Sequence, residues 1–302
     1  MINTNSTLYG FNEKFKFINH LLINNQLPRS IIFNGERGTG KRTFLFHFFA
    51  YLHLSKVEKI NYDNDFCIKN SKILERICSN ALPNIKIIKK IEKSQDITID
   101  QIREVILFCS YEAFEKQPRY ILIQNVENMN LNASNALLKI LEKPPANTYF
   151  FLNKNSNSKI LSTINSRCHN FNLKINTLES DLIFKKLVNQ FDLKKFNNFN
   201  IFNSYDTHGS KINRISYLLK NRIDDSSLLE IIKFCLMDFK KNKNYEAFCF
   251  AGEFAKNFFR IRFEENFKKT NFFYKLFVAN IEKNLKFNLD INSTIQILNK
   301  MS

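Results

Sequence analysis

Residues 33–44 read FNGERGTGKRTF, and their types and spacing are those of a loop that holds phosphates. In the pattern G-x-x-x-x-G-K, backbone N–H groups wrap the phosphate oxygens and the lysine ammonium neutralises their charge. The residues for these tasks are Gly35, Gly38, Gly40 and Lys41. A hydroxyl normally follows the lysine and helps to hold Mg²⁺, but here Arg42 intervenes and Thr43 lies about 100° further round the helix. We therefore expect a degenerate nucleotide site, Arg42 and Thr43 included, that holds any ATP or ADP weakly and without Mg²⁺.

The acidic element of such a site is altered as well. Phosphate loops that hydrolyse ATP work with a buried strand that ends in Asp, usually followed by another acid. The corresponding strand here is Tyr120–Ile123, and the amides Gln124 and Asn125 follow it. An amide has no charge to hold a divalent cation and is not basic near neutral pH. Glu127, two residues further on, is interpreted as a surface or capping carboxylate, so catalysis by this chain is not expected.

The cysteines do not have the spacing of a metal site. All six are scattered without a C-x-x-C pair, which is typical of reduced thiols rather than of structural zinc. Cys67 and Cys78 cannot complete a tetrahedral site alone, and Cys168 directly precedes His169, a spacing that rarely converges on one ion. We expect no bound metal.

The composition is that of a globular protein with excess positive charge. The 302 residues suffice for two or three domains, 44% are hydrophobic, and no apolar run is long enough to span a membrane. Because the N-terminal segment does not resemble a signal peptide, we expect the chain in the cytoplasm. The formal charge of +17 fits nucleic-acid binding, but the lysines are spread along the whole chain, so the charge only supports that interpretation.

Short apolar runs alternate with helical patterns up to about residue 173. Strands are predicted at 29–33, 85–88, 120–123 and 149–152. Helices are predicted at 41–54, at 99–110 after a cap at Thr98, and at 131–142 before Pro144 and Pro145. This alternation predicts an α/β fold in which a mostly parallel sheet has helices on both faces.

Beyond residue 173 only helical periodicity is found. The segments 181–191 and 226–240 show it, and no proline follows residue 173. We therefore expect an all-helical second half, divided internally at the polar stretch Lys220–Ser227.

Residues 133–152, ASNALLKILEKPPANTYFFL, together with the triplet Ser166-Arg167-Cys168, resemble the AAA+ subunits of bacterial clamp loaders, specifically the delta prime family. The likeness is dense over residues 8–173 and thin beyond them, apart from 207–219. It implies an AAA+ P-loop domain at 1–173, a small helical lid at 174–222 and a helical collar for oligomerisation at 223–302.

The resemblance also implies roles for three side chains. Arg167 would be an arginine finger, which reaches across an interface to the γ-phosphate of ATP in a neighbouring subunit. A guanidinium suits this task because it offers a rigid fork of donors to the charge that develops in phosphoryl transfer. Arg214 matches a lid arginine that faces nucleotide bound in the same chain, and Asn155 falls near a polar residue that senses the γ-phosphate.

The function that this resemblance implies is that of a non-motor subunit in the clamp loader of DNA polymerase III. The subunit would supply Arg167 in trans to a neighbouring ATPase, so that the sliding clamp is loaded on primed DNA during replication. Its partners would be the gamma/tau and delta subunits, the clamp and, within the complex, primed DNA, with no membrane. Its own ATPase would be weak or absent.

Two alternatives stay open. In the first, the chain is an active gamma/tau-type clamp-loader ATPase in which Thr43 and Glu127 replace the lost groups. In the second, it is a nucleic-acid-binding module whose positive charge is the function. The second predicts that the isolated chain binds duplex DNA with a steep dependence on salt.

Overall fold

The computed structural model describes residues 6–69, 71–91, 96–111, 117–191, 193, 202–203, 205–287 and 291–300. The chain divides into two compact units, one of residues 1–184 with 207–210 and the other of residues 185–206 with 211–302. Within the described residues, no helix is both long enough and apolar enough to cross a membrane.

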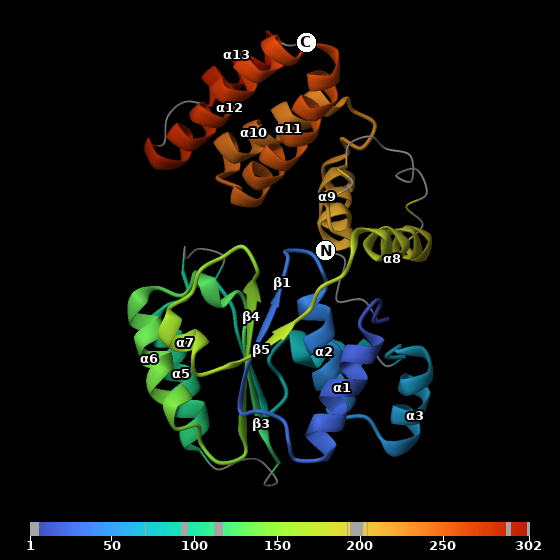
Figure 1. The fold of residues 1–302 in the computed structure, drawn as a ribbon, viewed down its shortest axis with the longest axis vertical. Helices are drawn as coiled ribbons and strands as arrows, with labels where there is room; N and C mark the ends of the chain where they lie inside the picture. The colour runs from blue at the N-terminus through green and yellow to red at the C-terminus, as the bar shows by residue number, and fades with distance from the viewer. Residues whose placement is uncertain are drawn as a thin grey trace. The chain divides into compact units, whose positions relative to one another are not determined.

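A parallel sheet forms the centre of the first unit (Figure 1). Its five strands are β1 (Ser30–Gly35), β2 (Ile85–Ile88), β3 (Arg119–Ile123), β4 (Thr148–Asn155) and β5 (His169–Asn172). They lie in the order β2-β3-β4-β1-β5, and each neighbouring pair is parallel. Since all strands run the same way, their carboxyl ends meet at one edge, where the loop after β1 follows a strand flanked by β4 and β5, with β3 on the far side of β4.

Helices cover both faces of this sheet, as Figure 1 shows. One face carries α1 (Asn12–Ile23), α2 (Lys41–Leu52), α3 (Lys56–Asp65) and α4 (Ser71–Cys78). The other carries α5 (Ile99–Ser110), α6 (Leu131–Glu142) and the short α7 (Ser162–Asn165). Each face has its own apolar core, one rich in phenylalanine and the other in isoleucine and leucine. The predicted α/β class with a doubly covered parallel sheet is confirmed.

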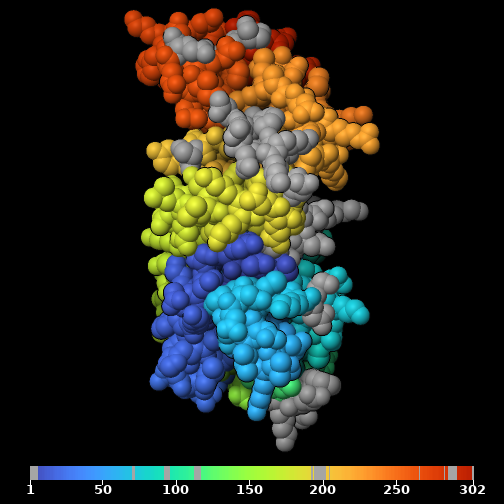
Figure 2. All heavy atoms as spheres, turned by 90° about the vertical axis from the view of Figure 1, so that its right-hand side faces the viewer, coloured from blue at the N-terminus to red at the C-terminus, as the bar shows by residue number. Residues whose placement is uncertain are grey.

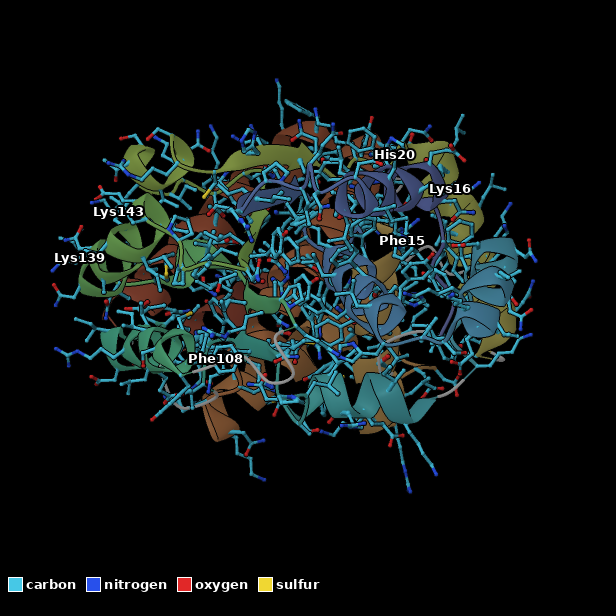
Figure 3. All side chains as sticks on the ribbon, turned by 90° about the horizontal axis from the view of Figure 1, so that it is seen from below. Phe15, Lys16, His20, Phe108, Lys139 and Lys143 are labelled. Carbon is cyan, nitrogen blue, oxygen red and sulfur yellow. The ribbon has the colours of Figure 1, made fainter. Side chains whose placement is uncertain are left out.

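An aromatic cluster holds α1 against α2 and α3. The ring of Phe15 on α1 lies 5.8 Å from that of Phe44 and 5.2 Å from that of Tyr62, measured between centroids. Figure 2 shows the outside of this face, where α1 (blue) lies beside the α3 region (cyan). In Figure 3, Phe15 points into the unit, whereas Lys139 and Lys143 point outward from the opposite face.

Several elements differ from the sequence predictions, among them β1, which begins at Ser30 and continues to Gly35 rather than spanning 29–33. Helix α2 ends at Leu52, not at residue 54, because Ser55 begins a capping box in which its backbone N–H donates to Glu58 Oε2 at 2.9 Å. Strand β4 continues three residues beyond residue 152, to Asn155. Strand β5 is a polar, largely exposed segment that no apolar run announces, and it is defined by its backbone pairing with β1.

Helices are the regular secondary structure of the second unit among its described residues. It contains α10 (Leu228–Asn242), α11 (Tyr245–Glu265), α12 (Phe267–Phe287) and α13 (Asn292–Asn299), while α8 (Thr177–Gln190) and α9 (His208–Asn221) each have residues in both units. Helices α10 and α11 pack through aromatic rings, with the centroids of Phe239 and Phe248 4.6 Å apart. The predicted helical second half is confirmed. Its division into a lid at 174–222 and a collar at 223–302 stays a prediction.

Candidate functional site

The loop between β1 and α2 turns its lysine back onto its own backbone. Gly38 and Gly40 have φ angles of +82° and +93°, and α2 begins directly afterwards at Lys41. The Nζ atom of Lys41 donates hydrogen bonds to the carbonyl oxygens of Gly35 and Glu36, each at 2.7 Å. The lysine side chain is buried, so the cation that would meet a phosphate is held by carbonyl groups of the loop itself.

The charge of this lysine is weakened by its surroundings. Burial lowers the pKa of Lys41 to about 8, while the carboxylates of Glu127 and Glu36 act in the opposite direction. An exposed lysine has a pKa of about 10.4 and is fully charged at neutral pH. Because desolvation disfavours the charged form, the Lys41 ammonium is a poorer partner for an anion than the sequence motif alone suggests.

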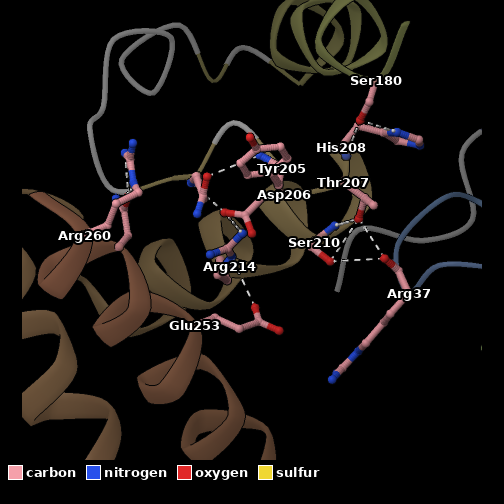
Figure 4. Close-up of polar contacts among 12 residues, drawn as sticks. Arg37, Ser180, Tyr205, Asp206, Thr207, His208, Ser210, Arg214, Glu253 and Arg260 are labelled. Carbon is pink, nitrogen blue, oxygen red and sulfur yellow. Dashed lines mark hydrogen bonds and ion pairs between the residues drawn. The ribbon is translucent and has the colours of Figure 1, made fainter. Parts of the chain in front are cut away.

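Residues 207–210, which we call the latch, lie against the outer side of the loop (Figure 4). Thr207 Oγ1 donates to the carbonyl oxygen of Arg37 at 2.7 Å, and the N–H of Gly209 donates to the carbonyl oxygen of Gly38 at 3.0 Å. A Cβ atom added to Gly38 would collide with Thr207 Oγ1 and with the backbone nitrogen of Ser210. The loop and the start of α9 are therefore joined by a side-chain and a backbone hydrogen bond, and their close approach leaves no room for a side chain at residue 38.

The two residues after the lysine do not complete a metal site. The guanidinium of Arg42 lies 4.8 Å from the ring centroid of Phe46, one turn further along α2, and its Nη2 atom is 4.0 Å from Cys78 Sγ. The side chain is exposed and leads away from the loop, and Thr43 is half-buried on α2. A contribution of Arg42 and Thr43 to nucleotide binding stays a prediction, and these contacts do not favour it.

Amides occupy the ends of β3 and β4 where acids would hold a metal. The backbone N–H of Asn125 donates to the side-chain oxygen of the buried Asn153 at 2.9 Å. Asn155 is the last residue of β4, and its side-chain oxygen accepts from the N–H of Asn157 at 3.3 Å. The amide of Asn155 is thus engaged in the turn that follows its own strand, and its predicted sensing of a γ-phosphate is untested.

Glu127 lies in surroundings that its place in the sequence does not indicate. It lies in the short 3₁₀ helix η2 (Val126–Asn128), where its Oε1 atom accepts from the N–H of Asn155 at 3.1 Å. Its Oε2 atom is buried. The interpretation as a surface or capping carboxylate is therefore wrong, because the carboxylate turns inward to the end of β4. Its proximity to Lys41 could not be found from the sequence, because the two residues are far apart along the chain.

Arg167 lies at the surface, between α7 and β5. Its Nη2 atom is 2.7 Å from Glu142 Oε1, and its Nη1 atom donates to the carbonyl oxygen of Thr163 at 3.0 Å. The side chains of Arg167 and Glu142 are 35% and 51% exposed, so solvent reaches both partners. The next residue, Cys168, points inward, and burial raises the pKa of its thiol to about 12. In the triplet Ser166-Arg167-Cys168, the guanidinium therefore faces outward, and the buried thiol beside it helps to fix the backbone.

Arg214, the second arginine singled out by the resemblance, is wholly buried in the second unit (Figure 4). Its Nη2 atom is 2.6 Å from Asp206 Oδ2, and its Nε atom is 3.5 Å from Glu253 Oε2. The guanidinium also lies over the rings of Phe202 and Phe254. These contacts give it a structural role in its own unit, and its predicted contact with nucleotide is untested.

The cysteines lie apart from one another in the described part of the chain. Thr7 Oγ1 donates to Cys67 Sγ at 3.6 Å, and Cys78 lies beside Arg42. Among the residues that the structure describes, no three His, Cys, Asp or Glu side chains are grouped so that they could hold a metal ion.

A parallel sheet whose first strand leads through a G-x-x-x-x-G-K loop into a helix defines the class of P-loop α/β proteins. Residues 11–177 match the family described as DNA polymerase III, delta subunit, and the chain belongs to this family. The delta' subunit of Haemophilus influenzae is 38% identical over 81 residues, which are 27% of this chain and 25% of that relative. The resemblance to the delta prime family stated from the sequence is thus confirmed.

The chain is also similar to a gamma/tau subunit of DNA polymerase III. The gamma/tau subunit of Mycoplasma genitalium is 28% identical over 186 residues, which are 62% of this chain and 29% of that relative. A solved structure of a DNA polymerase III gamma subunit-related protein from Thermotoga maritima has a TM-score of 0.49 at 17% identity and covers 94% of this chain and 97% of that one. The chain spans less than a third of the length of either sequence relative.

Proposed function

We propose that the chain is a non-motor subunit of a DNA polymerase III clamp loader that donates Arg167 to ATP bound in a neighbouring subunit. The observation that carries this proposal is the contrast between an outward guanidinium and an inward lysine. Arg167 is partly exposed beside an exposed carboxylate, whereas Lys41 is buried and hydrogen-bonded to its own loop. In this proposal, a sliding clamp and primed DNA are the substrates of the assembled loader.

The ion pair of Arg167 allows such a donation. Exposed pairs contribute only about 0–1 kcal/mol, so a polyphosphate can replace Glu142 as the partner at little cost. The planar guanidinium makes two parallel hydrogen bonds to phosphate oxygens more readily than an ammonium does. An arginine supplied in trans contributes about 10³–10⁵-fold to phosphoryl transfer at the site that it serves.

The test uses a loader reconstituted from this chain and its partner subunits. We expect Arg167→Ala to lower the clamp- and DNA-stimulated ATPase rate of the whole loader several-fold, because the large loss at the one site that Arg167 serves is averaged with hydrolysis at the other sites. Arg167→Lys should restore little of the rate because the fork is lost. The control is Arg103→Ala, which removes another exposed arginine from an ion pair, the one with Asp100. An Arg167→Ala loader that hydrolyses ATP at the rate of the unmodified one would exclude the donation.

The rival function is that of a gamma/tau-type ATPase. It is favoured by the likeness to gamma/tau subunits and by a carboxylate, Glu127, that acts on the loop lysine. Titration of the isolated chain with a fluorescent ATP analogue separates the two functions. Submicromolar, Mg²⁺-dependent binding with turnover would support the rival, whereas our proposal expects weak binding that Mg²⁺ does not strengthen.

A further inference from the structure

Glu127 belongs to a chain of contacts that crosses the carboxyl edge of the sheet. Its Oε1 atom accepts from the N–H of Asn155, and Asn155 lies opposite Gly35 in the register of β4 and β1. The carbonyl oxygen of Gly35 accepts both from Lys41 Nζ, at 2.7 Å, and from the N–H of Ser156, at 3.1 Å. The carboxylate of Glu127 and the ammonium of Lys41 are therefore each hydrogen-bonded to a backbone group at the paired ends of β4 and β1, Asn155 and Gly35.

The charge of this carboxylate acts on the loop. Among the carboxylates that oppose the lowered pKa of Lys41, Glu127 has the larger effect and Glu36 the smaller one. Glu36 is exposed, so solvent and salt screen its charge, whereas the Oε2 atom of Glu127 is buried. That oxygen accepts no hydrogen bond from the described residues. Solvent and salt screen a buried carboxylate less than an exposed one, so it attracts a nearby cation and repels an anion more strongly.

We propose that Glu127 is the built-in counter-ion of Lys41 and that it keeps phosphate groups out of the loop. The lysine that would bind a phosphate already has an acidic partner fixed by β4, and an entering polyphosphate brings negative charge next to that partner. This inference rests on the proposed non-motor function and names the residue that maintains it. In the rival ATPase the same carboxylate has the opposite task, because it would hold Mg²⁺ and so help nucleotide to bind.

The experiment compares nucleotide binding by the isolated full chain and its variants. The probes are ADP and inorganic pyrophosphate, titrated by calorimetry once in EDTA and once with Mg²⁺. The test variant is Glu127→Gln, which removes the charge and keeps an oxygen that can accept from Asn155. We expect its affinity for both probes in EDTA to rise about tenfold or more above that of the unmodified chain. A second change, Lys41→Met, should abolish the gain.

Two controls make the result specific. Glu36→Gln removes the exposed carboxylate that acts on the same lysine, and we expect it to change affinity less than twofold. Isotope-labelled methylation of the lysines followed by NMR reports the pKa of Lys41, which should fall in Glu127→Gln because the opposing charge is gone. A carboxylate with only a packing role would leave that pKa in place.

Two outcomes would overturn the proposal. One is an affinity in Glu127→Gln that equals that of the unmodified chain in EDTA. The other is a loss of Mg²⁺-dependent binding in the variant, which would make Glu127 a metal ligand. The first result leaves the donation of Arg167 untouched, because that donation is read from the assembled loader, whereas the second would also favour the rival ATPase. A failure of this inference alone is therefore distinguishable from a failure of the proposed function.

Discussion

Two arginines that the sequence places at nucleotide sites have opposite surroundings in the two units of the molecule. Arg214 is wholly buried between carboxylates and aromatic rings, while the side chain of Arg167 is 35% exposed and has one carboxylate partner at the surface. The sequence motifs assign contact with nucleotide to both arginines, because a motif contains only residue types and their spacing. Burial separates them, since a buried guanidinium with satisfied charge stabilises its own unit and an exposed one can change partners.

The largest effect is expected for the buried arginine. Arg214→Ala removes the cation between Asp206 and Glu253 and leaves two acidic groups without it, which should lower the free energy of unfolding by about 3 kcal/mol. Lys256→Ala, an exposed change on the same helix as Glu253, should cost less than about 0.5 kcal/mol. Urea denaturation followed by circular dichroism measures both. A loss below about 1 kcal/mol for Arg214→Ala would mean that this arginine does little to stabilise its own unit. Contact between Arg214 and nucleotide would then again be the better explanation of its place in the motif.

The latch gives the next largest effect, now in the first unit. Gly38→Ala places a Cβ against Thr207 and Ser210 at a residue with φ of +82°, which should cost about 2 kcal/mol or more. Gly252 on α11 is the matched control, because a Cβ there meets nothing within 4 Å. Gly252→Ala should stabilise the chain by about 0.5–1 kcal/mol, as replacement of a helical glycine does. Equal effects of the two changes would mean that the latch does not hold the loop.

Much of the sheet could be predicted from the sequence, because its central strands are continuous apolar runs. Strand β2 and helices α5 and α6 have the bounds that the patterns indicate, since buried apolar spacing and the caps at Thr98 and Asn130 act locally. Strand β5 could not be predicted, because its residues are polar and only its pairing with β1 makes it a strand.

The candidate site was predictable in its residue types but not in its contacts. The glycines and Lys41 follow from spacing, and the missing acids follow from Gln124 and Asn125. That Lys41 binds its own loop, and that Glu127 turns toward Asn155, depends on three strands meeting at one edge. Such tertiary contacts leave no local pattern in the sequence.

A smaller effect, with a defined dependence on pH, is expected at Lys41. Its pKa in the folded chain is about 8, below the value of about 10.4 expected when unfolded, so the unfolded chain binds more protons between these values. The buried charge therefore costs stability below pH 8, and this cost disappears as the pH rises toward 10. Lys41→Met should stabilise the chain at pH 7 by about 1–2 kcal/mol. This is less than the free energy that corresponds to the whole pKa shift of Lys41, because Glu127 loses its counter-ion.

In Lys41→Met, the two carbonyl oxygens that lose the ammonium keep other hydrogen-bond donors. The lost hydrogen bonds therefore do not mask the stabilisation. Gly35 O still accepts from Ser156 N–H, and Glu36 O still accepts from Thr39 Oγ1 at 3.0 Å. Urea denaturation at pH 7 and at pH 9.5 should show the advantage of Lys41→Met shrinking at the higher pH. An advantage that grew with pH would contradict the direction of the lysine's pKa shift.

The smallest effect on the free energy of unfolding is expected for the exposed arginine. Arg167→Ala breaks an ion pair whose two side chains are 35% and 51% exposed, so it should change the free energy of unfolding by less than about 1 kcal/mol. Glu142→Gln should cost equally little, and high salt should reduce both effects because exposed charges are screened. Urea denaturation at low and at high ionic strength measures this. A loss as large as that expected for Arg214→Ala would mean that Arg167 is fixed in its own unit, and it would then be unable to turn toward a phosphate outside it.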